Sequence, residues 1–180
     1  MVDANATFNW APLESNPEIF ADYMKTVGMP NNWTFGEIYG FEEDLLAFIP
    51  TPCVAVIINA EFLKKEEDRA KGDISVANDY YMKQTDVLDN ACGVIACIHA
   101  ILNNLGEGEG KITLKEGSVL ANMRTACASM SAEERAAALE ANADFSAVHT
   151  SFAAEGQSNQ AEHQEDVKHH FVAFVVNSAG

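Results

Sequence analysis

The alternation of apolar and polar positions predicts several short helices along the chain. The clearest begins after Asn16, whose side-chain oxygen suits a helix N-terminus, and ends before Gly28, with apolar residues at helical spacing between them. Ser131 and Glu134 have the spacing of a capping box, which predicts a helix to about residue 140. Similar patterns predict helices over residues 42–48, 118–127 and 145–152, and a charged surface helix over 61–73.

Other runs have the character of strands. Residues 33–39 alternate large apolar side chains with smaller or polar ones, which predicts a half-buried strand. Residues 54–58 are continuously apolar, which is typical of a strand buried on both faces. Residues 80–82 form a shorter strand-like run, and residues 169–176 form the last predicted strand. Together these elements predict a mixed α/β protein.

The stretch from residue 80 to residue 104 holds the strongest candidate for chemistry. An apolar helix is expected to begin near Cys92, with Asp89 or Asn90 as its cap. A thiol in the first turn lies at the positive end of the helix dipole, which favours the thiolate. Gly93 adds no side chain beside the sulfur, and the Gln84 amide could point at an oxyanion. This pattern is typical of a catalytic cysteine, although most cysteines at the start of an apolar helix are core residues.

The histidines divide by position. His169 and His170 are neighbours on a predicted strand, so only one of them can face Cys92, and the pattern alone does not choose between them. His99 lies seven residues after Cys92 on one helix, about 10 Å along its axis, and is therefore expected to be a packed residue. His149 and His163 are expected on the surface.

The length and net charge of the chain limit the classes of function that it can have. A chain of 180 residues is about one domain. The net charge of −16 argues against nucleic-acid binding and would attract a basic protein surface. No apolar run is long enough to span a bilayer, and the first residues lack a secretory signal pattern. Four cysteines without paired spacing indicate free thiols, so a cytoplasmic protein is expected.

Three segments resemble the ubiquitin C-terminal hydrolases, which are papain-like cysteine proteases. They are residues 9–17 (NWAPLESNP), the strings KQT, NACG and IHA between Lys83 and Ala100, and the region around His170. The resemblance runs in order from Trp10 to Val176. It implies an α/β fold of the α+β type, with a central, mainly antiparallel sheet flanked by helices, in a single catalytic domain over residues 1–180 that is incomplete at its C-terminal end.

The resemblance also implies roles. Cys92 would be the nucleophile, His170 the general acid and base, and Gln84 the oxyanion stabiliser. The partner would be ubiquitin or a ubiquitin-like protein, whose recognised face is basic, and a monomer without metal or organic cofactor is expected. Residues 155–166 would form a crossover loop over the active site, which would restrict the reaction to small or flexible adducts.

Two departures from the family pattern leave alternatives open. Gln84 and Cys92 are eight positions apart, whereas the family motif has six, so about two residues are inserted between Thr85 and Asp89. The family aspartate, about fifteen residues after the histidine on the next strand, would lie beyond Gly180. The alternatives are a truncated, weakly active or inactive ubiquitin-binding protein, and a sequence that is a piece of an ordinary enzyme.

Overall fold

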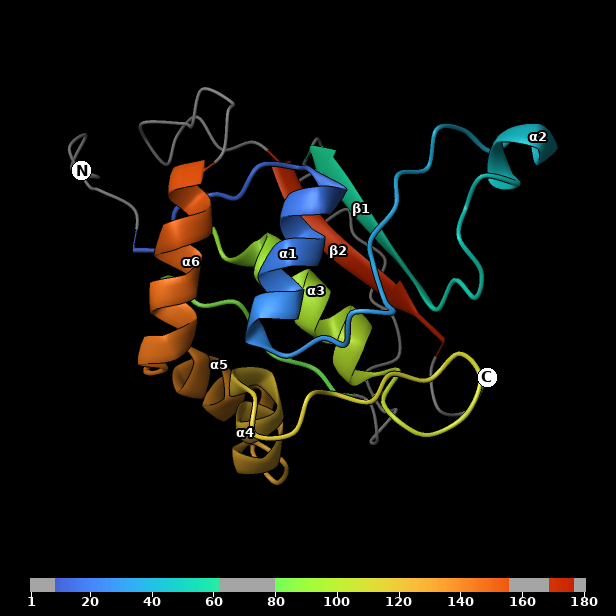
Figure 1. The fold of residues 1–180 in the computed structure, drawn as a ribbon. Coiled ribbons are helices and arrows are strands. Elements are labelled where there is room, and N and C mark those ends of the chain that lie inside the picture. Colours follow the sequence, from blue (N-terminus) through green and yellow to red (C-terminus); the bar gives the residue numbers. More distant parts are fainter. Residues whose placement is uncertain (1–8, 62–79, 156–168, 177–180) are drawn as a thin grey trace.

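The computed structural model describes residues 9–61, 80–155 and 169–176 (Figure 1). Its helices and strands follow one another along the chain as α1 (Pro17–Val27), α2 (Glu43–Leu46), β1 (Ala55–Glu61), α3 (Cys92–Leu102), α4 (Val119–Ala126), α5 (Ala132–Glu140), α6 (Ala143–Glu155) and β2 (His169–Val175). Where the sequence carries explicit caps, the helices begin as predicted. Asn16 accepts a hydrogen bond from the Glu18 N–H, and Ser131 forms the capping box with Glu134.

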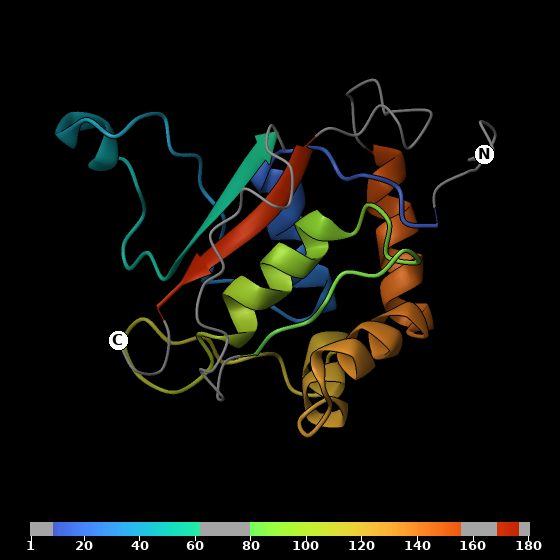
Figure 2. The ribbon, with the colours of Figure 1, turned by 180° about the vertical axis from the view of Figure 1, so that it is seen from behind.

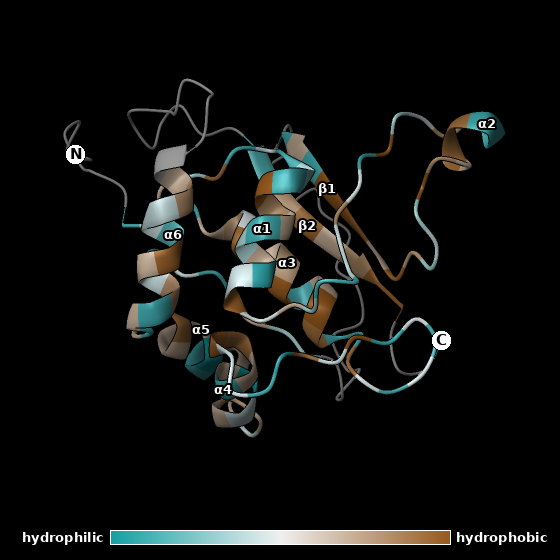
Figure 3. Ribbon diagram, viewed as in Figure 1, coloured by the Kyte–Doolittle hydropathy of each residue, from teal (hydrophilic) through white to brown (hydrophobic). Residues whose placement is uncertain are grey.

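Helix α3 is the centre of the core. Ten of its eleven residues are buried, and His99 alone is partly exposed. The β1–β2 ribbon packs against one side of α3, and α1 packs between α3 and α6 (Figures 1 and 2). The ribbon coloured by hydropathy has α3 largely in the hydrophobic range (Figure 3). A helix that is apolar on all sides is stable only when other elements cover all of it, because each side must be removed from water.

The sheet has two antiparallel strands in the described part of the chain. Ala55 is opposite Val175, and Ala60 is opposite His170. Phe171 packs inward against Phe20, with ring centroids 5.3 Å apart, whereas Val172 and Phe174 are exposed. The predicted α/β class with an antiparallel sheet is thereby confirmed, and the sheet positions the residues around His170 against α3.

Three strand predictions differ from the structure. Residues 33–39 and 80–82 have no regular secondary structure and form no ladder, and Tyr39 is 69% exposed. Alternation alone does not supply the partner strand that a ladder requires. Strand β1 is half-buried at its start and exposed beyond Ile57, so it is not buried on both faces. The predicted charged helix lies outside the described residues, except for Glu61 at the end of β1.

Candidate active site

Cys92 is the first residue of α3, as the sequence predicts, but the cap differs from the prediction. The N-cap residue is Ala91, whose side chain forms no cap hydrogen bond. The Asp89 carboxylate instead accepts hydrogen bonds from the backbone N–H groups of Asn9 and Trp10, at 2.9 and 2.8 Å, and from that of Asn90. The carboxylate therefore ties the N-terminal segment to the turn before the nucleophile instead of capping the helix.

The Cys92 thiol is largely withdrawn from solvent, with 8% of the residue exposed. Burial raises the pKa of the thiol above its ordinary value, and the backbone N–H groups of Phe171, Gly93 and Cys92 itself offset only part of that effect. The helix terminus therefore does not bring the pKa of this thiol below its ordinary value in the free protein. The N–H groups that would stabilise a thiolate are nevertheless in place around the sulfur.

Strand β2 supplies one wall beside this sulfur. A Cβ atom on Gly93 would lie 3.4 Å from the Phe171 ring and 3.2 Å from that of Phe20, so a side chain at residue 93 would crowd the contact between the helix start and the strand. His170 directly precedes Phe171 and is half-buried, whereas His169 is exposed. Strand β2 packs against α3, so the segment that contains His170 lies beside the helix that begins with Cys92.

Gln84 does not present a free amide. Its Nε2 atom donates to the Leu88 carbonyl at 2.9 Å and to the Asp89 carbonyl at 2.7 Å. Both N–H bonds of the side chain are used in this way, and both acceptors belong to the segment that carries the insertion. Gln84 is therefore not available as an oxyanion donor in this conformation, because both of its N–H bonds are directed at carbonyls of its own loop.

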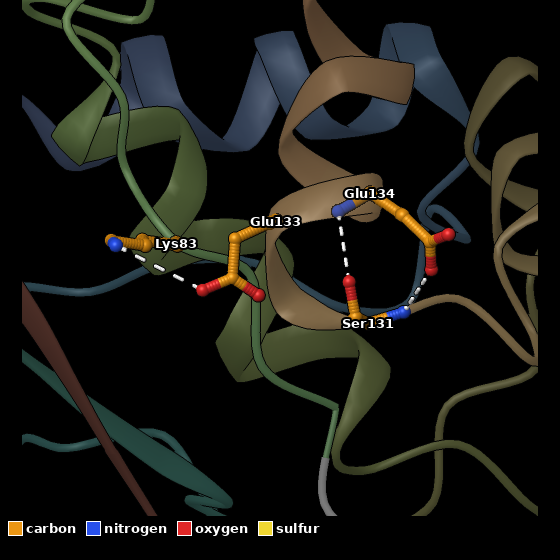
Figure 4. Close-up of polar contacts among 4 residues, drawn as sticks. All are labelled: Lys83, Ser131, Glu133 and Glu134. Atoms are coloured by element: carbon orange, nitrogen blue, oxygen red, sulfur yellow. Dashed lines mark hydrogen bonds and ion pairs between the residues drawn. The ribbon is translucent and has the colours of Figure 1, made fainter.

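The inserted segment is anchored on several sides. The Thr85 hydroxyl donates to the Glu140 carboxylate at the end of α5, and the Leu88 side chain is buried. The residue before Gln84 is held by the same helix: the Lys83 N–H donates to the Ala132 carbonyl, and its ammonium lies 3.8 Å from Glu133 (Figure 4). The loop from Gln84 to Cys92 is accordingly fixed at its entry, its middle and its exit.

Asn90 is a polar residue of this loop to which the motif gave no chemical role beyond a possible cap. It is 6% exposed, and its Nδ2 atom has no hydrogen-bond acceptor among the described residues. A buried amide donor left without a partner costs about 1–3 kcal/mol. The sequence signal for it is its position two residues before Cys92, within the motif string NACG.

His99 and His149 are packed residues. His99 accepts a hydrogen bond from the Met82 N–H, stacks on Tyr81, and burial lowers its pKa to about 4, which confirms that it is a packed residue. His149 is 3% exposed, with Nε2 2.7 Å from the Ala11 carbonyl and its ring 4.6 Å from that of Trp10. Its predicted surface position is therefore wrong, because α6 turns it toward the N-terminal segment. His163 lies outside the described residues.

Other features of the described ranges lie apart from this site. A cleft of about 780 Å³ runs between residues 32–38 and 49–57, and neither Cys92, Gln84 nor His170 lines it. No cluster of three or more metal-binding side chains is present in the residues that the structure describes. Among the same residues, no helix is both long and apolar enough to cross a bilayer.

Comparison with known proteins covers almost the whole chain. Residues 10–179 match the family model described as ubiquitin carboxyl-terminal hydrolase, family 1. A probable ubiquitin carboxyl-terminal hydrolase of Dictyostelium discoideum is 38% identical over 176 residues, which are 93% of this chain and 67% of that protein. A ubiquitin carboxyl-terminal hydrolase of Drosophila melanogaster is 38% identical over 180 residues, or 92% of this chain and 73% of that protein.

A solved structure agrees with the fold. The catalytic domain of UCH37 from Trichinella spiralis, bound to ubiquitin vinyl methyl ester, superposes with a TM-score of 0.70 at 24% identity. The match covers 98% of this chain and 74% of that one.

Proposed function

The chain belongs to family 1 of the ubiquitin carboxyl-terminal hydrolases, and from this membership we propose that it is a deubiquitinating thiol hydrolase. Its reaction would remove small or flexible adducts from the C-terminal glycine of ubiquitin. The observation that supports this most directly is Cys92 at the first position of α3, with backbone N–H groups from α3 and β2 around its sulfur.

The proposed nucleophile is the Cys92 thiolate. It attacks the carbonyl carbon at the ubiquitin C-terminus, a carbon–sulfur bond forms, and the carbonyl electron pair moves onto oxygen. Because burial raises the pKa of the resting thiol, its proton must leave as the substrate binds. Collapse of the tetrahedral intermediate expels the leaving group and leaves a thioester, which water hydrolyses.

The proposed proton acceptor is His170. It is the half-buried member of the histidine pair, and its chain neighbour Phe171 provides the backbone N–H beside the Cys92 sulfur. His170 would take the thiol proton and give it to the departing group. The exposed His169 has no part in this step.

The substrate class follows from family and charge. The net charge of −16 favours encounter with a basic protein surface and disfavours nucleic acid. The preference for small or flexible adducts depends on the predicted crossover loop over residues 155–166, and residues 156–168 lie outside the described part of the structure. Four free thiols suit a reducing compartment, so we place the protein in the cytoplasm, as a monomer in ubiquitin-dependent protein catabolism.

Two observations favour a second candidate, a ubiquitin-binding protein with weak or no hydrolysis. The Gln84 amide is fully used by Leu88 and Asp89, and the resting thiol of Cys92 is buried with a raised pKa. Both features would slow acyl transfer without weakening binding of ubiquitin.

Ubiquitin vinyl methyl ester separates the two candidates. The enzyme is expected to form a covalent adduct at Cys92, located by peptide mass spectrometry and lost in Cys92→Ser. The binder would retain ubiquitin without labelling. Absence of both labelling and binding, from a chain that is folded by circular dichroism, would refute the assignment of ubiquitin as substrate.

A further inference from the structure

The most unusual polar group near the nucleophile is the Asn90 side chain. It is 94% buried, and its Nδ2 atom has no acceptor in the described part of the chain. Buried amide donors in folded proteins are nearly always paired, so an exception beside a reactive residue calls for an acceptor that arrives later. Asn104, at the other end of α3, is equally buried but donates to the Val54 and Ala100 carbonyls.

Asn90 lies close to the nucleophile along the backbone. It precedes the N-cap residue Ala91 and is two positions from Cys92. Consecutive Cα atoms are about 3.8 Å apart, so the Cα atoms of residues two positions apart are separated by about 7 Å at most. An amide carried on a short side chain can span that distance to an oxygen on the carbon attached to Sγ.

The other side-chain donor of this loop is occupied. Gln84 donates both of its N–H bonds to the Leu88 and Asp89 carbonyls of the same loop. A developing oxyanion requires at least one donor that is already aimed and unpaired, since donors that need not reorganise contribute most.

We propose that Asn90 donates a hydrogen bond from Nδ2 to the oxyanion that forms when Cys92 attacks the substrate carbonyl. The backbone N–H of Cys92 supplies the second donor, and Gln84 acts as a positioning residue that holds the loop. This inference rests on the proposed thiol hydrolase function. The donor keeps its proton throughout, while the thiol proton passes to His170 and on to the leaving group.

The test is the kinetics and stability of Asn90→Ala and Asn90→Leu, with Asn104→Ala as the matched buried control. With a ubiquitin ester as substrate, both Asn90 variants should lose about 10²–10³-fold in kcat with KM little changed, the usual effect of removing one oxyanion donor. The melting temperature of Asn90→Leu, which keeps a side chain of similar size, should not fall, because the donor that it removes has no partner among the described residues. Asn104→Ala should melt at a lower temperature and retain most of its kcat.

A second measurement isolates the tetrahedral state. Ubiquitin aldehyde adds to the Cys92 sulfur and places an oxygen where the oxyanion forms, so its affinity should fall in both Asn90 variants while that of unmodified ubiquitin does not. Unchanged kcat in both Asn90 variants would overturn the proposal, and so would a loss of kcat seen in Gln84→Ala alone. A folded wild-type chain that neither reacts with ubiquitin vinyl methyl ester nor hydrolyses the ester would instead overturn the proposed function.

Discussion

The four free thiols differ sharply in their surroundings. Cys53 is exposed, whereas Cys92, Cys97 and Cys127 are buried, and burial raises the pKa of each of these three. Accessibility and thiolate fraction both control alkylation, so the nucleophile of the proposed reaction should not be the most reactive thiol of the free protein.

We therefore predict that iodoacetamide at neutral pH modifies Cys53 before Cys92, as followed by peptide mass spectrometry over time. Because the pKa of Cys92 is raised, its alkylation rate should still be rising at alkaline pH values at which the rate of an ordinary thiol, with a pKa of about 8.5, has levelled off. In Cys53→Ser the fast phase should vanish. Faster labelling at Cys92 than at Cys53 would show that the resting sulfur is more open than its 8% exposure indicates.

The paired histidines allow a direct comparison on one strand. His170→Ala should lower kcat/KM for a ubiquitin ester by about 10²–10⁴-fold, the usual contribution of a general acid and base. His169→Ala, at the exposed neighbouring position, should stay close to wild type. Equal losses in the two variants would mean that neither histidine alone accepts the thiol proton.

At the scale of elements, α5 holds the segment that leads into the active-site loop. Its N-terminus combines a capping box with the Lys83–Glu133 ion pair (Figure 4). Ser131→Ala should reduce the free energy of unfolding by about 1 kcal/mol. Glu133→Gln should change it by less, because both charged side chains are more than half exposed and surface pairs contribute about 0–1 kcal/mol. Chemical denaturation measures both changes. A larger loss of stability in Glu133→Gln than in Ser131→Ala would show that the ion pair is the stronger of the two interactions.

Helix α3 brings a pH dependence through His99. Burial lowers the folded-state pKa of His99 to about 4, against about 6.5 in the unfolded chain, so the unfolded state binds the proton more readily. Stability from this group is complete above about pH 6.5 and is lost progressively as the pH falls toward 4, by up to about 3 kcal/mol. Urea denaturation at several pH values should give a flatter profile for His99→Gln. An unchanged slope would assign the acid sensitivity to other groups, of which His149, with its lowered pKa, is the first.

Local signals explain which elements were predictable. Helices α1 and α5 follow from their caps, because a capping side chain acts within three residues of the backbone groups it binds. Helix α3 and the proposed nucleophile likewise follow from one continuous apolar run. Contacts between distant segments were not predictable. Residues 33–39 lack a partner strand, and His149 is buried against Ala11; both depend on segments far away in the sequence. The hydrogen bonds of Gln84 depend on the exact length and path of the loop that follows it.

At the scale of the whole molecule, charge is the dominant property. With a net charge of −16, encounter with ubiquitin should slow as salt rises from about 10 to 150 mM, because the screening length falls from about 30 to 8 Å. The second-order rate of labelling by ubiquitin vinyl methyl ester measures this. Alkylation of exposed Cys53 by neutral iodoacetamide should not change over the same range. A salt-independent labelling rate would exclude electrostatic steering.

The anchored segment between Gln84 and Cys92 also has a consequence for chain length. Seven residues lie between these two positions, whereas the resembled motif has five. Closing the longer loop costs only about 0.3 kcal/mol more in chain entropy. A single net hydrogen bond contributes more, about 0.5–1.5 kcal/mol. The approach to the nucleophile can therefore change length at small cost, provided that the new backbone carbonyls find donors, as those of Leu88 and Asp89 do in Gln84.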